Sequence, residues 1–274
     1  MKAAVLQMTA GIDPQANAQT LVAAVAEAQA GGATMLFTPE MSGLIDRDRA
    51  RAASSIVAAE DDPVLAAVRA AAAEHGLWVH IGSLAVRGTD GRFANRGFVI
   101  DDRGAIRATY DKIHLFDVDL PTGESWRESA AYAPGERAVA VDTPLGRLGL
   151  SVCYDLRFAA LYGALSEAGA TLLAVPAAFT VPTGEAHWHT LLRARAIEAG
   201  AFVIAAAQAG QHEDGRTTYG HSLAIDPWGR VLLDMGDATG VGFAELDDAI
   251  TADVRARIPV LQHRRPIPAV ELAG

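Results

Sequence analysis

The sequence has few or none of several features that would place it in other classes of protein. It contains one cysteine in 274 residues, which excludes an internal disulfide framework and fits a reducing compartment. Zinc sites built mainly from thiolates are excluded for the same reason. No apolar run reaches the ~18 residues that a membrane-spanning helix needs. The N-terminal "MKAAVLQMTAG" also lacks the long apolar region of a signal peptide, so we expect a cytoplasmic protein with no membrane segment.

Positive charge is also scarce. The 23 lysines and arginines are outnumbered by 33 aspartates and glutamates, which gives a net charge of −10 at pH 7. An acidic surface repels both nucleic acid and anionic membrane, so we expect neither as the main partner. Half of the residues are hydrophobic and a fifth are charged. That composition is typical of a globular protein with ample material for a core.

Short apolar runs alternate with longer alanine-rich segments along the chain. The runs predicted to be strands cover 3–8, 34–39, 78–86, 96–101, 105–112, 148–153, 171–177, 202–208, 221–226, 231–235 and 241–246. Helices are predicted at 15–30, 62–75, 157–168, 185–199 and 247–256. Several strands are almost continuously apolar, so both faces of their sheets should be covered. The pattern therefore predicts an α/β fold in which two sheets pack together with helices outside.

We expect one domain over residues 1–274, because no linker, repeat or low-complexity segment interrupts this pattern. The tail 258–274 carries three prolines and cannot form a core helix. We expect it to be an arm that lies at a subunit interface.

Three reactive side chains follow predicted strands. "MLFTPE" ends in Glu40, "IRATYDK" in Lys112 and "LGLSVC" in Cys153. Functional groups of open α/β sheets collect beyond the carboxyl ends of strands, so these three should face one cleft. Each has an ordinary alternative when taken alone, because a cysteine is often a small buried hydrophobe and a charged residue is often in a solvated loop. Together they make a nucleophile, a proton acceptor and a fixed cation, which is a full set for acyl transfer.

The chemistry of the three groups favours this interpretation. A thiol with a pKa of ~8.5 needs a base or a positive neighbour before it attacks. A carboxylate partly withdrawn from water, such as Glu40, can take that proton and later return it. The Lys112 ammonium would stabilise the thiolate and then the oxyanion. The backbone N–H of Tyr154, at the turn after Cys153, would be a second oxyanion donor.

The order and context of these residues resemble the nitrilase superfamily of carbon–nitrogen hydrolases. Its Glu-Lys-Cys triad is matched in "FTPEM", "YDKIHLFD" and "GLSVCYDLRF", and the similarity covers nearly the whole chain. The resemblance implies a four-layer α-β-β-α sandwich, with two mixed sheets and helices outside, that forms a homodimer or a higher homo-oligomer. It also implies catalysis without a metal or an organic cofactor.

A fourth site residue, Glu128, is implied by the same resemblance. In "SWRES" it matches a second family glutamate that holds the lysine and helps to orient the substrate. The residues alone leave Glu124 and Glu136 of the same polar segment as alternatives.

The segments "TGEAHW" and "YGHSLAIDPWG" bring the chain nearer to the Nit branch, whose members hydrolyse amides. The resemblance implies a cysteine-dependent amidase that hydrolyses a small carboxylate-bearing amide through a thioester. The substrate most favoured is deaminated glutathione, which would yield 2-oxoglutarate and cysteinylglycine. The alternative is an ω-amidase acting on 2-oxoglutaramate or succinamate. A nitrilase, a carbamoyl amide hydrolase or a non-catalytic scaffold subunit is less favoured.

Two other pairs of residues in the sequence carry groups that could bind a metal or a substrate. His187 and His189 stand two residues apart, which points them to different faces of a helix, unlike the four-residue spacing of zinc proteases. We therefore expect no metal there. Asp155 and Arg157 are expected to brace the turn after Cys153 rather than to touch substrate.

Overall fold

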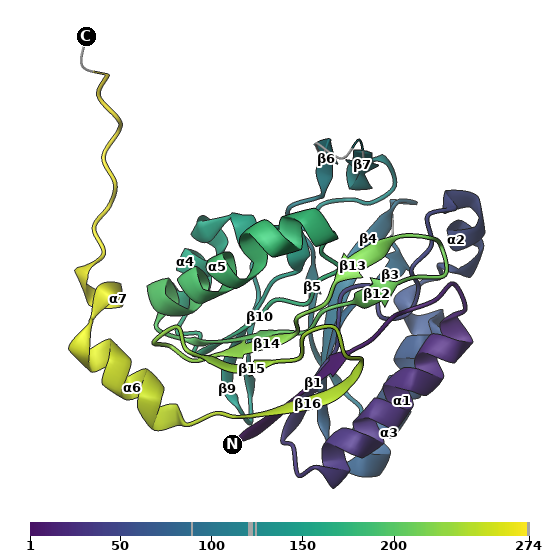
Figure 1. The fold of residues 1–274 in the computed structure, drawn as a ribbon, viewed down its shortest axis with the longest axis horizontal. Coiled ribbons are helices and arrows are strands. Elements are labelled where there is room, and N and C mark those ends of the chain that lie inside the picture. The colour runs from purple at the N-terminus through teal and green to yellow at the C-terminus, as the bar shows by residue number, and fades with distance from the viewer. Residues whose placement is uncertain (89, 120–122, 124, 273–274) are drawn as a thin grey trace.

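The computed structural model describes the whole chain apart from residues 89, 120–122, 124, 273 and 274. Two six-stranded sheets form its centre (Figure 1). The first has the order β16-β1-β2-β3-β4-β5 and the second β15-β14-β11-β10-β9-β8. Both sheets mix parallel and antiparallel pairs, as expected.

The strands of the first sheet are β1 (Lys2–Gln7), β2 (Met35–Phe37), β3 (Trp78–Arg87), β4 (Phe93–Ile100), β5 (Ile106–Asp111) and β16 (Gly240–Glu245). Those of the second are β8 (Ala140–Thr143), β9 (Gly146–Leu150), β10 (Leu172–Ala174), β11 (Phe202–Ala205), β14 (Leu223–Ile225) and β15 (Val231–Asp234). Two small ribbons lie outside the sheets: β6 (Asp117–Asp119) with β7 (Ser125–Arg127), and β12 (Ala209–Gln211) with β13 (Thr217–Tyr219).

The helices lie outside the two sheets (Figure 1). The longer ones are α1 (Pro14–Ala30), α3 (Pro63–His75), α4 (Ala159–Glu167), α5 (Val181–Ala199) and α6 (Asp248–Arg257). Shorter ones are α2 (Arg49–Ser55), α7 (Val260–His263) and the 3₁₀ turns η1 (Ala59–Asp61), η2 (Glu128–Ala130) and η3 (Cys153–Arg157). Both α1 and α3 begin with an aspartate cap followed by proline, which fixes their first turns.

Side-chain alternation along β1 explains the layering. Successive side chains of a strand point to opposite faces. Ala3 and Val5 join the core shared with the second sheet, whereas Ala4 and Leu6 join the core shared with α1 and α3. The helices α4 and α5 add residues such as Leu165 and Leu192 to the core of the second sheet. The four-layer α-β-β-α sandwich is therefore confirmed.

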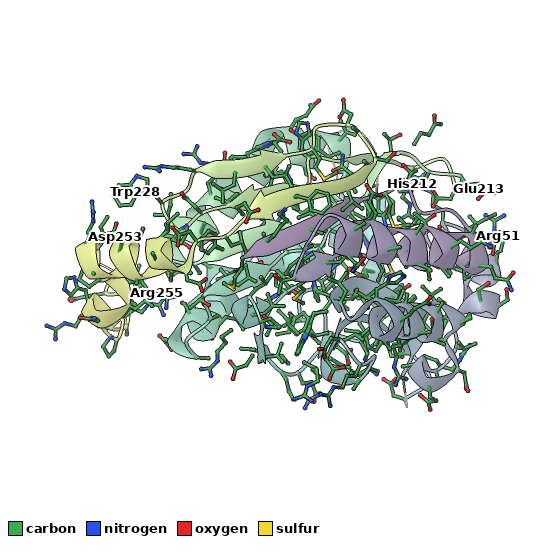
Figure 2. The ribbon with its side chains drawn as sticks, turned by 90° about the horizontal axis from the view of Figure 1, so that it is seen from below. Arg51, His212, Glu213, Trp228, Asp253 and Arg255 are labelled. Atoms are coloured by element: carbon green, nitrogen blue, oxygen red, sulfur yellow. The ribbon has the colours of Figure 1, made fainter. Side chains whose placement is uncertain are left out.

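The C-terminal part leaves this body. Figure 2 shows α6, with Asp253 and Arg255, at one end of the molecule and Arg51 of α2 at the other. Arg255 ties α6 to the second sheet's loops by donating to the carbonyls of Gly200 (2.9 Å) and Ala170 (2.6 Å).

Beyond α7 the chain runs outward (Figure 1), and its apolar side chains Ile267, Val270 and Leu272 are 85–92% exposed. Its role as an interface arm stays a prediction. None of the helices in the described ranges has the length and apolar character needed to cross a membrane.

Candidate active site

Cys153 opens the 3₁₀ turn η3, three residues after β9 ends. Its backbone is left-handed, with φ of 51°, a conformation that non-glycine residues seldom adopt away from functional sites. Its N–H donates to the carbonyl of Pro176 at 2.8 Å, which locks the turn to the loop after β10. The side chain is 7% exposed. The thiol is therefore held in a fixed turn just beyond the end of β9.

Glu40 comes from the first sheet, three residues after β2, and is 4% exposed. Its Oε1 accepts from Lys112 Nζ and from Asn95 Nδ2, each at 2.9 Å. Its Oε2 accepts from the backbone N–H of Ala178 at 2.9 Å, across the junction between the sheets. The Cys153 thiol lies close enough to this carboxylate for the two groups to shift each other's pKa. One carboxylate thus joins the three predicted residues.

Lys112 directly follows β5 and is 2% exposed. Its Nζ lies 2.9 Å from Glu40 Oε1 and 2.9 Å from Glu128 Oε2. Glu128 also accepts from Asn95 Nδ2 at 3.0 Å and from the N–H of Phe116 at 2.7 Å. The ammonium therefore has two fixed carboxylate partners.

Glu124 and Glu136 are the alternatives to Glu128 in the same polar segment. Glu136 is exposed and does not line the cavity described below. Glu124 lies outside the described residues. Of Glu128 and Glu136, which the structure describes, only Glu128 contacts Lys112.

Burial and neighbouring charges shift the pKa values of these groups. Burial raises the pKa of the Cys153 thiol well above its usual range, and the charge of Glu40 raises it further. Burial would also raise the pKa of Glu40, but the Lys112 ammonium and the hydrogen bonds to the carboxylate hold it below its usual value. Burial disfavours the charge on Lys112, yet Glu128 and Glu40 keep its pKa well above the usual range. The resting site therefore holds a neutral thiol against an ionised carboxylate and an ammonium.

Asp155 braces the turn, as its place in the sequence predicts. Its Oδ2 accepts from Tyr110 Oη (2.7 Å) and from the N–H of Val152 (2.9 Å). Its Oδ1 accepts from the N–H of His114 at 3.0 Å. Tyr154 is the second residue of η3, a position at which the N–H has no acceptor within the helix. That geometry leaves this N–H available as an oxyanion donor.

A cavity of about 560 Å³ opens above the triad. Glu40, Lys112 and Cys153 share its floor with aromatic walls from Phe116, Trp126, Tyr154 and Phe179. Arginines line it as well: Arg47, Arg49, Arg127, Arg157 and Arg216. The guanidinium groups of Arg47 and Arg216 lie 5.3 and 5.0 Å from the centre of the Trp126 ring.

Part of this site has little or no signal in the sequence. Asn95, 1% exposed, donates to both Glu40 and Glu128, and its one signal was a polar side chain within the apolar strand "FANRGFVI". Arg157 was expected to brace the turn, but it lies on the cavity wall, over the rings of Tyr154 and Phe179. The cavity arginines come from segments around residues 47–49, 127, 157 and 216, and no local pattern in the sequence marks their convergence.

Comparison with known proteins agrees with the fold and the site. Residues 2–256 match the carbon-nitrogen hydrolase family. The chain therefore belongs to this family of enzymes, which hydrolyse carbon–nitrogen bonds.

Over 268 residues the chain is 40% identical to the deaminated glutathione amidase of Yersinia enterocolitica, and the alignment covers 96% of this chain and 92% of that protein. The crystal structure of the C. elegans NitFhit protein superposes with a TM-score of 0.89 at 38% identity. That match covers 96% of this chain but 65% of the longer NitFhit chain.

A third relative is a mutant of the amidase from Nesterenkonia sp. AN1, with a TM-score of 0.81 and 28% identity, covering 97% of this chain and 94% of that one. In that structure the acetamide moiety of fluoroacetamide is covalently added at the active-site cysteine. The carbon–nitrogen hydrolase class predicted from the sequence is thus confirmed.

Proposed function

We propose that the protein is an amidase that uses Cys153 as its nucleophile and passes through a thioester, and that its substrate is deaminated glutathione. The observation that carries the proposal is that Glu40, Lys112 and Cys153 line one cavity, where the Glu40 carboxylate is paired with the Lys112 ammonium at 2.9 Å. A nucleophilic thiol is activated when a general base lies next to it and a third group holds that base in position.

Each step can be assigned to one of these residues. Glu40 takes the thiol proton as the sulfur attacks the amide carbonyl, and the negative charge moves to the carbonyl oxygen. Lys112 and the Tyr154 N–H stabilise this oxyanion. The intermediate collapses by breaking the C–N bond, and Glu40 gives its proton to the departing amine. Water, deprotonated by Glu40, then attacks the thioester, which releases the acid and restores the thiol.

The shifted pKa values fit these roles. Because the pKa of Cys153 is raised and that of Glu40 lowered, the proton stays on sulfur until the carbonyl arrives. Lys112 remains charged throughout, so it acts as an electrostatic partner and not as the base. Asn95 and Glu128 keep the ammonium and the carboxylate in place.

The cavity supports an anionic substrate. Guanidinium groups are the side chains best suited to bind carboxylates, because their N–H donors match the two oxygens. The described cavity-lining residues include five arginines, and although Arg216 is paired with Asp214 through Nε, a guanidinium has further N–H donors for a bound carboxylate. Trp126 also lines the cavity, and its buried Nε1 has no hydrogen-bond partner among the described residues. A volume of about 560 Å³ suits a ligand of peptide size.

The test compares deaminated glutathione with 2-oxoglutaramate as substrates of the purified protein. We expect a higher kcat/KM for deaminated glutathione, with 2-oxoglutarate and cysteinylglycine as products. A large preference for 2-oxoglutaramate would make the protein an ω-amidase instead. Cys153→Ala should remove turnover of both substrates, and turnover by that variant would refute the nucleophile.

Alkylation of Cys153 separates an amidase from a non-catalytic scaffold subunit. Iodoacetamide should label Cys153 stoichiometrically, and substrate should protect the thiol. An inert buried thiol would not react.

A further inference from the structure

A second cluster of chemically active side chains lies outside the triad. His189 of α5, His221 before β14 and Asp234 at the end of β15 meet at the surface. His189 Nε2 is 3.0 Å from Asp234 Oδ2, and His221 Nδ1 is 2.9 Å from Asp234 Oδ1. One ligand atom from each residue lies within 4.8 Å of the other two. The side chains are 26–35% exposed, so an ion in solvent can reach them.

The backbone of His221 holds an unusual conformation at this cluster. The described non-glycine residues with positive φ are Met41, Cys153 and His221. Cys153 is the proposed nucleophile and Met41 follows Glu40, so two of the three lie at the active site. Such conformations are retained where the surrounding structure enforces them, often for a functional reason.

Contacts from neighbouring elements enforce it here. The N–H of His221 donates to the carbonyl of Gly236 (2.8 Å), and Trp188 Nε1 donates to the carbonyl of His221 (2.8 Å). The N–H of Gly236 donates in turn to Asp234 Oδ1 (2.9 Å). The His221 ring stacks on Tyr219 at 4.5 Å between centroids. The ring and the carboxylate are therefore oriented before any ligand arrives.

We propose that His189, His221 and Asp234 form a binding site for a divalent transition metal, with Zn²⁺ as the best-matched ion. Two imidazoles and one carboxylate are common zinc ligands, and water can take the fourth tetrahedral position. Zinc ligands at about 2.0–2.1 Å stand roughly 3.3 Å apart, and each nitrogen now faces a different oxygen of Asp234, so small side-chain rotations must bring the three ligand atoms from within 4.8 Å of one another to that spacing.

Two neutral histidines can bind the ion by changing tautomer, and no proton is lost overall. In the metal-free cluster each ring nitrogen that faces Asp234 carries the proton of a hydrogen bond. When the ion binds, that nitrogen supplies its lone pair, and the proton moves to the other ring nitrogen through solvent. The ion would tie α5 to the strands that follow it.

His187 gives the contrast that makes the proposal specific. It is on the same helix two residues earlier, and its Nδ1 lies 3.2 Å from Arg157 Nη1, away from the cluster. The spacing argument against a His187–His189 pair therefore holds, and the second histidine ligand comes from a distant part of the chain.

The test measures metal binding and does not depend on amidase activity. Metal binding is measured on the full-length Cys153→Ala variant, in which the catalytic thiol cannot compete as a ligand. Co²⁺ is the optical probe for tetrahedral coordination, and Zn²⁺ affinity is measured by competition with a chromophoric chelator. The ligand variants are His189→Gln, His221→Asn and Asp234→Asn, and the matched control is His187→Gln. Asparagine tolerates positive φ, so His221→Asn keeps the backbone.

We expect one equivalent of metal in the parent protein. Each ligand variant should weaken binding by about tenfold or more, whereas His187→Gln should stay within about twofold of the parent. Circular dichroism of each variant separates loss of a ligand from loss of the fold. Absence of stoichiometric binding in the parent, unchanged binding in folded Asp234→Asn, or an equal loss in His187→Gln would overturn the site.

Discussion

Replacement of Lys112 by glutamine tests the electrostatic core of the site. The chain has two lysines, Lys2 and Lys112. Lys112 is 2% exposed and contacts two carboxylates at 2.9 Å. Its loss leaves Glu40 and Glu128 buried without their cation. Removing one partner of a buried ion pair costs about 3–5 kcal/mol. For a domain of this size that lowers the Tm by roughly 10 °C.

The stability difference should depend on pH. In the wild type the pKa of Glu40 is lowered, so its contribution to stability is present above the unfolded-state value and is lost as the pH falls through the folded value. In Lys112→Gln, burial and repulsion between the carboxylates raise the pKa of at least one of them, so stability is lost as the pH rises. The difference in unfolding free energy should therefore be small near pH 4.5 and large near pH 8.

Urea unfolding followed by circular dichroism at fixed protein concentration measures this difference, and kcat/KM is measured on the same samples. We expect kcat/KM to fall by about 100-fold or more, as loss of an oxyanion donor does. Lys2→Gln is the control, because Lys2 is 33% exposed at a surface pair with Glu245 and should change stability by less than about 1 kcal/mol. A destabilisation that does not vary with pH, or a kcat/KM within a few-fold of wild type, would refute the reasoning.

Three further substitutions test neighbouring parts of the site. Glu128→Gln keeps the size of the side chain but removes one of the two negative charges that contact Lys112. We expect kcat/KM to fall by about 10–100-fold while the fold survives, and full activity would exclude a positioning role. Gly82→Ala should lower the unfolding free energy by about 1–3 kcal/mol in urea titrations, because its Cβ would collide with the carbonyl of Pro39, next to Glu40. Arg216→Gln should raise the KM for deaminated glutathione by about tenfold and leave iodoacetamide labelling of Cys153 intact; an unchanged KM would mean that this arginine does not bind the substrate.

The main elements of the fold could be predicted because local signals agree with the tertiary structure. The helices α1 and α3 match the predicted ranges within one residue, since an aspartate cap and a proline mark each start. The start of α5 was predicted four residues late, because Pro182 lies inside its first turn, where proline is tolerated.

Other elements could not be predicted because their stability comes from distant partners. The ribbons β6–β7 and β12–β13 are short and largely polar, so no apolar alternation marks them. Strand β10 ends at Ala174, three residues before the apolar run does, where the chain turns to meet the thiol. The run itself gives no signal for that turn.

The site divides in the same way. The triad residues could be found because each is a chemically distinct group after an apolar run. Asn95 and the arginines on the cavity wall could not, because their convergence depends on how distant segments of the chain meet. The same holds for the pairing of His189 with His221 and Asp234.

The hydrogen bond from the Ala178 N–H to Glu40 joins the two sheets, so the proposed site is complete only when both sheets have packed together. Cys153 follows a strand of the second sheet, whereas Glu40 and Lys112 follow strands of the first. A chain that has built either half alone holds inert groups, however complete its secondary structure. During refolding, turnover should therefore lag behind the far-ultraviolet signal, and it should appear only when the halves have docked.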